Sequence, residues 1–196
     1  MLGAGRGRIR PLPVNSLAPN ILTVLALCAG LTAMRFAILE RWHLAVIAIV
    51  VAAVLDGLDG RLARLLKGAT KFGAELDSLS DFVSFGVAPV FVLYLWSLKN
   101  IGGVGWIVVL VFSICCALRL ARFNTALDDP NRPSWQANFF TGVPAPAAAL
   151  LVLLGLDLSF DLGEHFWASN LINAPWVLFI SFLMVSRLPS FSFKKV

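Results

Sequence analysis

The chain has 196 residues, of which 59% are hydrophobic and only 14% are charged, and it carries a net charge of +5. A soluble domain is about 25% charged and about half apolar, so this composition argues against a single aqueous core and favours the bilayer as the solvent. The positive charge does not indicate nucleic-acid binding, because the basic residues lie between apolar segments, where membrane orientation explains them.

The first eighteen residues contain three arginines and two prolines before the apolar sequence that starts at Ile21. A signal peptide has a short apolar core followed by a small-residue cleavage site. That pattern is absent here, so we expect no removable signal. We expect residues 1–18 to form a basic interfacial segment, 19–190 a membrane domain and 191–196 a short basic tail.

Six apolar segments follow, each near the roughly twenty residues that cross a bilayer as a helix. They cover residues 20–39, 43–65, 73–96, 104–123, 143–158 and 170–188. The fifth is short and contains prolines. The sequence therefore predicts an all-α integral membrane protein with six transmembrane helices.

The positions of the basic residues predict the orientation of these helices. With both termini on the inner side, all of the sixteen Lys and Arg residues except Arg35, Arg41 and Lys99 fall on that side. Because inner loops are enriched in Lys and Arg, we expect cytoplasmic termini in a cell membrane. Both histidines, His43 and His165, fall on the outer side, so we expect no histidine base or metal ligand.

Four carboxylates lie inside the second and third segments. They are Asp56, Asp59, Asp77 and Asp81. An ionisable residue inside a span costs several kcal/mol and therefore indicates a function or a buried partner. Pairing with Arg61 and Arg64 is one explanation, but four carboxylates against two arginines leave excess negative charge. That excess calls for cations.

The spacing brings these carboxylates together. Asp56 and Asp59 are three residues apart and Asp77 and Asp81 are four apart, so each pair shares one helix face. A short turn makes the two helices antiparallel, and Asp56 lies roughly 20 Å from the outer end of its helix. Clustered oxygen ligands suit hard cations such as Mg²⁺ or Mn²⁺, and two such ions can clamp a phosphoryl centre.

Neighbouring residues suit a diphosphate ligand. Arg64 can donate two parallel hydrogen bonds to phosphate oxygens. Gly57, Gly60 and Gly73 lack side chains where a ligand or another helix could approach closely. These features predict a phosphoryl-transfer site in the inner half of the membrane.

The segment from Asp56 to Asp81 reads D-G-L-D-G-R-L-A-R, then eight residues, then G-x3-D-x3-D. It resembles the signature of the CDP-alcohol phosphotransferases at every fixed position. The resemblance implies a cytosol-facing cavity with two divalent ions, Mg²⁺ or Mn²⁺, held by Asp56, Asp59, Asp77 and Asp81, and it implies that Asp81 is the general base.

The same resemblance implies a binding site for a CDP-linked lipid, CDP-diacylglycerol. The positions that match nucleotide-binding positions of the family are Asn20, Thr23, Gly60, Arg64 and Thr70. Members of the family commonly form homodimers, which is the assembly that the resemblance implies here.

Three further stretches resemble the membrane-embedded phosphatidylserine synthases within this family. They are S-D-F-V-S-F-G-V-A-P over 80–89, R-L-A-R-F-N over 119–124 and F-F-T-G-V-P-A-P-A over 139–147. The acceptor alcohol would then be L-serine, and the products phosphatidylserine and CMP. We expect Arg122, or otherwise Arg119, to contact the serine carboxylate or a phosphate together with Asn124. The alternative is that both arginines only anchor the helix end at the inner side of the membrane and contact no substrate.

The sequence is also compatible with two other functions. Glycerol 3-phosphate or an inositol phosphate could be the acceptor, but a second phosphate needs additional basic groups, and the loop after Asn124 offers only Arg132. The carboxylates could instead line a divalent-cation transport path. A transporter would carry polar residues in both membrane halves, whereas the outer half here is almost wholly apolar.

The predicted orientation can be tested by cysteine labelling. Ser134→Cys and Glu164→Cys, each in a background without Cys28, Cys115 and Cys116, should react with an impermeant maleimide from opposite sides of the membrane. The positive-inside bias is the physical reason. Labelling of both positions from the same side would contradict the six-helix layout.

Overall fold

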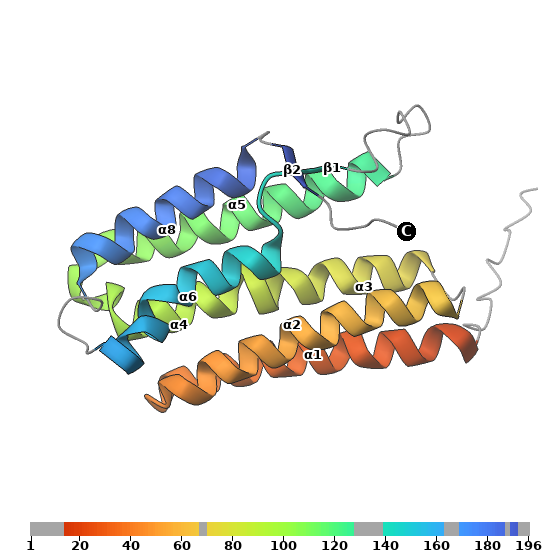
Figure 1. Ribbon diagram of the computed structural model, residues 1–196, viewed down its shortest axis with the longest axis horizontal. Helices are drawn as coiled ribbons and strands as arrows, with labels where there is room; N and C mark the ends of the chain where they lie inside the picture. The colour runs from red at the N-terminus through yellow and green to blue at the C-terminus, as the bar shows by residue number, and fades with distance from the viewer. Residues whose placement is uncertain (1–13, 67–69, 128–138, 163–168, 187–188, 192–196) are drawn as a thin grey trace, which may run out of the picture.

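The computed structural model describes residues 14–66, 70–127, 139–162, 169–186 and 189–191 (Figure 1). The predicted interfacial segment up to residue 13, most of the basic tail, His165 and both labelling positions lie outside these residues. The long helices are α1 (Val14–Ile38), α2 (Trp42–Leu65), α5 (Gly103–Leu127), α6 (Ala145–Leu162) and α8 (Asn170–Val185). The remaining long segment consists of α3 (Lys71–Asp81), a π-helix η1 (Phe82–Val87) and α4 (Ala88–Trp96).

Two short elements complete the described chain. A 3₁₀ helix η2 (Leu98–Ile101) leads into α5, and strand β1 (Phe139–Thr141) pairs antiparallel with β2 (Pro189–Phe191). Apart from this three-residue strand pair, the described fold is all-α, as the sequence predicts.

Helices α1 and α2 form an antiparallel pair joined by a tight turn (Figure 1). In the turn, Glu40 has φ of 56°, and the Arg41 N–H donates to the Phe36 carbonyl at 2.9 Å. Helix α1 also packs against α3, η1 and α4. Gly30 allows the approach to η1, because a Cβ there would lie 2.8 Å from the Ser84 Cα.

The π-helix in the third segment has a local cause in Pro89. Proline has no N–H, and in a regular α-helix its ring clashes with the carbonyl four residues earlier, here that of Phe85. The wider π turn, in which Ala88 N–H donates to the Val83 carbonyl, accommodates the proline. Hydroxyl groups then attach η1 to its neighbours: Ser84 Oγ donates to Ala26 O at 3.3 Å, and Ser113 Oγ donates to Gly86 O at 3.0 Å.

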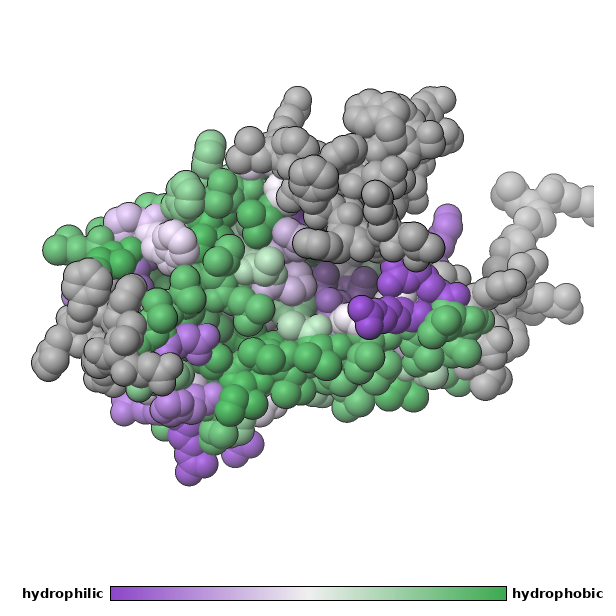
Figure 2. Space-filling model, viewed as in Figure 1, coloured by the Kyte–Doolittle hydropathy of each residue, from purple (hydrophilic) through white to green (hydrophobic). Residues whose placement is uncertain are grey.

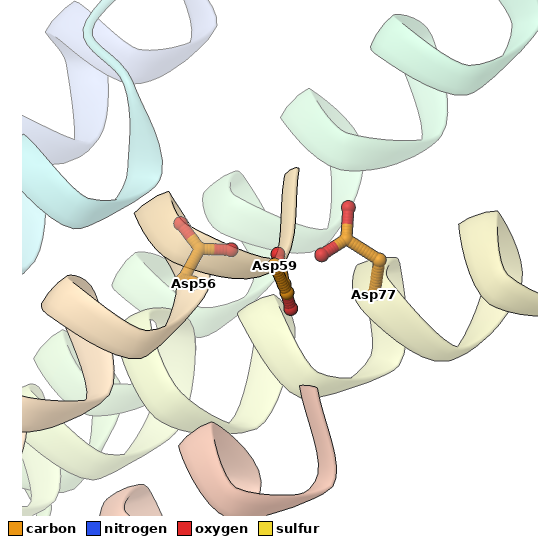
Figure 3. A group of neighbouring side chains, drawn as sticks. All are labelled: Asp56, Asp59 and Asp77. Carbon is orange, nitrogen blue, oxygen red and sulfur yellow. The ribbon is translucent and has the colours of Figure 1, made fainter. Parts of the chain in front are cut away.

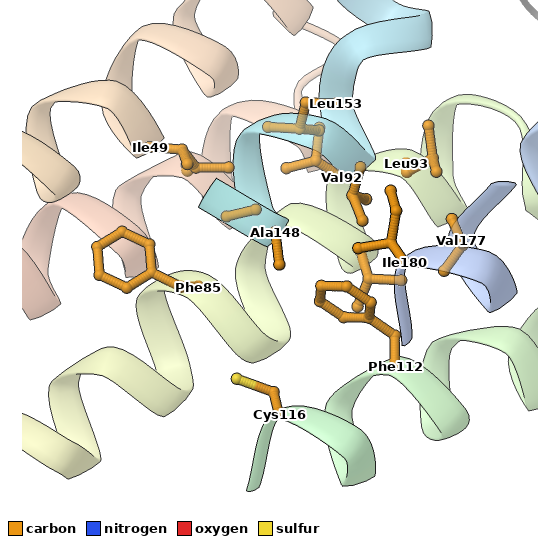
Figure 4. Close-up of a cluster of buried hydrophobic side chains, with 14 of the residues drawn as sticks. Ile49, Phe85, Val92, Leu93, Phe112, Cys116, Ala148, Leu153, Val177 and Ile180 are labelled. Carbon is orange, nitrogen blue, oxygen red and sulfur yellow. The ribbon is translucent and has the colours of Figure 1, made fainter. Parts of the chain in front are cut away.

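The apolar core lies between α2, η1, α4, α5, α6 and α8 (Figure 4). Ile49, Phe85, Phe112, Leu153 and Ile180 are fully buried in it. Many other large apolar side chains face outward from the helices, including Ile21, Ile47, Val54, Ile107 and Phe182. A bilayer would cover such a surface, in agreement with the composition.

The structure supports four of the six predicted membrane spans by length and composition. These spans are Leu17–Ile38, Trp42–Leu65, Lys71–Trp96 and Gly103–Ala126. The other two apolar helices, Ala145–Phe160 and Asn170–Val185, are shorter. Sixteen residues extend about 24 Å at 1.5 Å per residue, less than a hydrocarbon core of about 30 Å.

The first helix begins earlier than predicted. The sequence predicts a start at residue 20, whereas α1 begins at Val14 and includes Pro19. The sequence analysis assigned residues up to 18 to a basic interfacial segment, and α1 includes the last five of them. Pro19 lies beyond the first turn of α1, so its missing N–H removes one hydrogen bond inside the helix, but the helix continues through it.

Candidate metal centre

Three of the predicted aspartates meet where α2 and α3 face each other (Figure 3). Asp56 and Asp59 project from α2 and Asp77 from α3, and one carboxylate oxygen from each lies within 4.8 Å of the others. Asp59 is buried, with 4% of its surface exposed, and the other two are half-buried. Oxygen atoms gathered at this density are the donor set that a hard divalent cation prefers.

Asp81 lies beside this group rather than in it. It is one helical turn beyond Asp77 on α3, and its carboxyl group is within hydrogen-bonding reach of Asp56. Its oxygens are not among the three that lie within 4.8 Å of one another. The structure therefore separates Asp81 from the three-carboxylate cluster while keeping it in contact with one member.

The electrostatic surroundings of the cluster are negative. Asp77 and Asp81 are each repelled by other aspartates of this group, and Arg119 is the cation that interacts with the charge of Asp81 among the described residues. Arg61 and Arg64 are exposed, so they do not form the buried partners that the alternative explanation of the four aspartates required. The residues present thus fit a divalent cation.

Helix α1 contacts both helices that carry the aspartates. Thr23 Oγ1 donates a hydrogen bond to Asp59 Oδ2 at 2.6 Å. Ser80, next to Asp81 on α3, donates through its Oγ to the Thr23 carbonyl at 3.1 Å. Thr23 and Ser80 are both buried. One residue of α1 therefore links α2 to α3.

A pocket of about 170 Å³ opens next to the cluster. The residues lining it are Pro19, Asn20, Thr23, Asp59, Gly60, Ala63, Thr70, Gly73, Ala74 and Asp77. Figure 2 shows hydrophilic residues gathered over α3, bordered by the apolar side chains of the α1–α2 side. The pocket brings Asn20, Thr23, Gly60 and Thr70, which the sequence analysis grouped together, within one site.

The pocket wall includes the first turn of α3. Thr70 caps this helix by accepting a hydrogen bond from the Gly73 N–H at 3.0 Å. A Cβ at Gly73 would lie 2.9 Å from Asn20 Oδ1, so a larger residue would disturb the α1 side of the pocket. Because N–H groups and the helix dipole at a helix N-terminus favour anions, this wall suits a phosphate.

Some pocket residues differ from the predicted set. Arg64 lies in the last turn of α2, is exposed and does not line the pocket. Pro19, Ala63 and Ala74 line it, although the sequence analysis did not select them. Their apolar side chains carry no chemical signal, but Ala63 and Ala74 lie three or four residues from predicted pocket residues and so share their helix faces.

The three predicted acceptor residues lie on α5 in different environments. Asn124 Nδ2 donates to Ser78 Oγ at 2.9 Å, next to Asp77. Arg122 is exposed, and its Nη1 donates to the Val185 carbonyl at the end of α8 at 3.0 Å. Arg119 is half-buried, is close enough to Asp81 to interact with its charge, and has a buried Nε with no hydrogen-bond partner among the described residues.

Comparison with known proteins gives the family of the chain. Residues 16–185 match the sequence profile of the CDP-alcohol phosphatidyltransferases. The protein named CDP-diacylglycerol–serine O-phosphatidyltransferase in Mycobacterium tuberculosis is 46% identical over 189 residues, which are 96% of this chain and 65% of that protein. The chain thus spans just under two thirds of the length of that relative.

Shorter relatives carry the same name. The Helicobacter pylori protein is 38% identical over 94% of this chain and 77% of its own length. The Bacillus subtilis protein is 33% identical over 90% of this chain and 91% of its own length. The matched region contains all four aspartates, the pocket and the supporting contacts of α1 and α5. The chain is a member of the CDP-alcohol phosphatidyltransferase family.

Proposed function

We propose that the protein is a CDP-diacylglycerol–serine O-phosphatidyltransferase, which makes phosphatidylserine and CMP from CDP-diacylglycerol and L-serine. The observation that carries the proposal is the three-carboxylate cluster beside a pocket whose wall includes a helix N-terminus. This combination suits a metal-assisted reaction at a diphosphate. The names of the relatives support serine as the acceptor.

The cluster residues would hold the metal. Asp56, Asp59 and Asp77 would supply ligands, and Asp81, which is within hydrogen-bonding reach of Asp56, would join them in holding two divalent ions. A bound Mg²⁺ or Mn²⁺ would neutralise the diphosphate and polarise the phosphorus that is attacked. Gly60, Thr70 and Asn20 would contact the CDP moiety, and Arg64 would reach a phosphate from the rim.

Asp81 is the proposed general base. Its carboxylate would accept the proton of the serine hydroxyl while the hydroxyl oxygen forms a bond to the lipid-bearing phosphorus. The bond between that phosphorus and the oxygen bridging to the cytidylate then breaks, and CMP leaves. A carboxylate is a weak base for an alcohol, so positioning of the reacting groups contributes much of the rate.

Arg119 is the arginine best placed for the serine carboxylate. Its guanidinium interacts with the charge of Asp81, and its buried Nε has no hydrogen-bond partner in the part of the chain that the structure describes. The serine carboxylate would bind this guanidinium, and the serine hydroxyl would then point at the base. Arg122 instead donates to the α8 carbonyl of Val185. We therefore assign the carboxylate to Arg119, with Asn124 and Ser78 beside it, rather than to Arg122.

The proposal includes a membrane arrangement. Six transmembrane helices, with α6 and α8 as the two short ones, would place the metal centre in the inner half of the cell membrane, facing the cytoplasm together with both termini. The basic residues on the inner side support this orientation. A homodimer is the proposed assembly.

The metal centre can be tested by binding and removal. Asp77→Asn should weaken Mn²⁺ binding to the purified protein by at least about a hundredfold. Loss of a residue that only hydrogen-bonds to a metal ligand typically lowers metal affinity about ten- to a hundredfold, and loss of a ligand itself should lower it more. Glu75→Gln, two residues away and exposed, is the matched control and should bind as the unaltered chain does. EDTA should abolish activity until Mn²⁺ or Mg²⁺ is restored. Equal Mn²⁺ affinity in both variants would contradict the assignment of Asp77.

The reaction itself can be tested with purified protein, CDP-diacylglycerol, Mn²⁺ or Mg²⁺ and a panel of labelled alcohols. L-Serine should give phosphatidylserine and equimolar CMP. Asp81→Asn should bind the CDP-lipid but not turn over, since it lacks the base. Preference for glycerol 3-phosphate or an inositol phosphate would overturn serine while keeping the chemistry. Cation flux into vesicles without any CMP release would favour a transporter.

The acceptor site predicts different effects for two neighbouring arginines. Arg119→Ala should raise the serine KM by about ten- to a hundredfold, because a charge-assisted hydrogen bond contributes roughly 1.5–3 kcal/mol, with little change in the KM for CDP-diacylglycerol. Arg122→Ala should lower the thermal stability instead, through its lost bond to α8, and leave the serine KM near its original value. The reverse pattern in steady-state kinetics would move the carboxylate contact to Arg122.

A further inference from the structure

Thr23 lines the pocket and also forms a hydrogen bond to one of the three aspartates of the metal centre. It lies on α1, is 4% exposed, and is the α1 residue whose side chain reaches an aspartate of the cluster, Asp59, across 36 residues of sequence. Asp59 is likewise 4% exposed, the most buried of the three cluster aspartates. A buried carboxylate depends strongly on the few hydrogen bonds it receives.

The hydroxyl proton of Thr23 has two acceptors within reach. Thr23 Oγ1 is 2.6 Å from Asp59 Oδ2 and 3.0 Å from the carbonyl oxygen of Pro19, one helical turn earlier. One hydroxyl carries one proton. The carboxylate takes it, because a hydrogen bond to an ionised acceptor is shorter and stronger than one to a backbone carbonyl.

The backbone of Thr23 is itself held in place from α3. Its carbonyl accepts the hydrogen bond of Ser80 at 3.1 Å, and Ser80 lies between Asp77 and Asp81 in sequence. Thr23 therefore fixes Asp59 of α2 relative to the α3 helix that carries the other aspartates. A second residue of α1, Asn20, packs at Gly73 on the same α3 face.

We propose that Thr23 is a positioning residue of the metal centre, whose hydroxyl holds the Asp59 carboxylate in the orientation that lets one of its oxygens join those of Asp56 and Asp77. This inference takes from the proposed function only that the bound cation is a hard divalent ion. It assigns the hydroxyl of Thr23 to Asp59 rather than to direct contact with the nucleotide. Outer partners of this kind orient ligands and tune metal affinity.

The test is calorimetric titration of the purified full chain with Mn²⁺ alone, without lipid or serine. Thr23→Val keeps the shape but removes the hydroxyl, and it should weaken Mn²⁺ binding by about ten- to a hundredfold. Thr23→Ser keeps the hydroxyl and should restore the affinity to within about threefold of the original. The matched control is Thr32→Val on the same helix, because Thr32 is exposed and its hydroxyl donates to the Cys28 carbonyl of its own helix at 2.6 Å. The Mn²⁺ affinity of this variant should not change.

Several outcomes would overturn the inference. Unchanged Mn²⁺ affinity in Thr23→Val would do so, as would a loss of affinity in Thr23→Ser equal to that in Thr23→Val, since the affinity would then respond to any change of this side chain and not to the hydroxyl in particular. If Thr23→Val does not fold, the titration of Thr23→Ala against Thr23→Ser decides in the same way.

The result is separable from the proposed enzyme activity. A chain that makes no phosphatidylserine but loses Mn²⁺ affinity in Thr23→Val would sink the proposed function and keep the role of Thr23. An active chain whose Mn²⁺ affinity is the same with and without the hydroxyl would do the opposite. In the active chain, the Mn²⁺ concentration for half-maximal rate should also rise in Thr23→Val and recover in Thr23→Ser, while the KM for CDP-diacylglycerol measured at saturating Mn²⁺ stays within about threefold.

Discussion

Three carboxylates within 4.8 Å of one another repel each other, and helices in a bilayer give them little water to screen that repulsion. At an effective dielectric constant of about 20, each pair of charges at this distance costs roughly 3.5 kcal/mol. A single hydrogen bond to a charged group contributes only about 1.5–3 kcal/mol. The bond from Thr23 to Asp59 therefore orients a carboxylate but does not offset the repulsion. The proposed cation, together with the packing of α1, α2 and α3, would offset the rest.

The packing around the cluster follows from this requirement. Helix α1 pairs with α2 along its length and also contacts α3, so the two aspartate helices share one neighbour. Beyond Asp81, the π-helix at Phe82–Val87 is attached to α1 and α5 by the hydroxyls of Ser84 and Ser113. These polar contacts lie between helices whose other surfaces are apolar. They fix the direction of α3 close to the residue proposed as the base.

The sequence alone predicts the main features of the site but not the way it is supported. The i, i+3 and i, i+4 spacings place the aspartates on facing helices, and three of them do meet; Asp81 stands aside because it lies a full turn farther along α3. Arg122 and Arg119 look equivalent in sequence, and only the position of the α8 end, far away in the chain, separates their environments. The fifth helix is short, as the sequence predicts, whereas α1 begins earlier than predicted and α8 ends at Val185 rather than at residue 188.

The position of the cluster suits a reaction between a lipid and a water-soluble alcohol. A lipid diphosphate lies at the membrane surface, with its acyl chains in the hydrocarbon layer and its nucleotide in water. The pocket lies between the apolar outer face of the α1–α2 pair and the hydrophilic residues over α3 (Figure 2). The N-terminal turn of α3, which suits a phosphate, is then followed along the same helix by Asp77, which meets Asp56 and Asp59 of α2. A carboxylate cluster in the middle of the apolar core would meet neither of the proposed substrates.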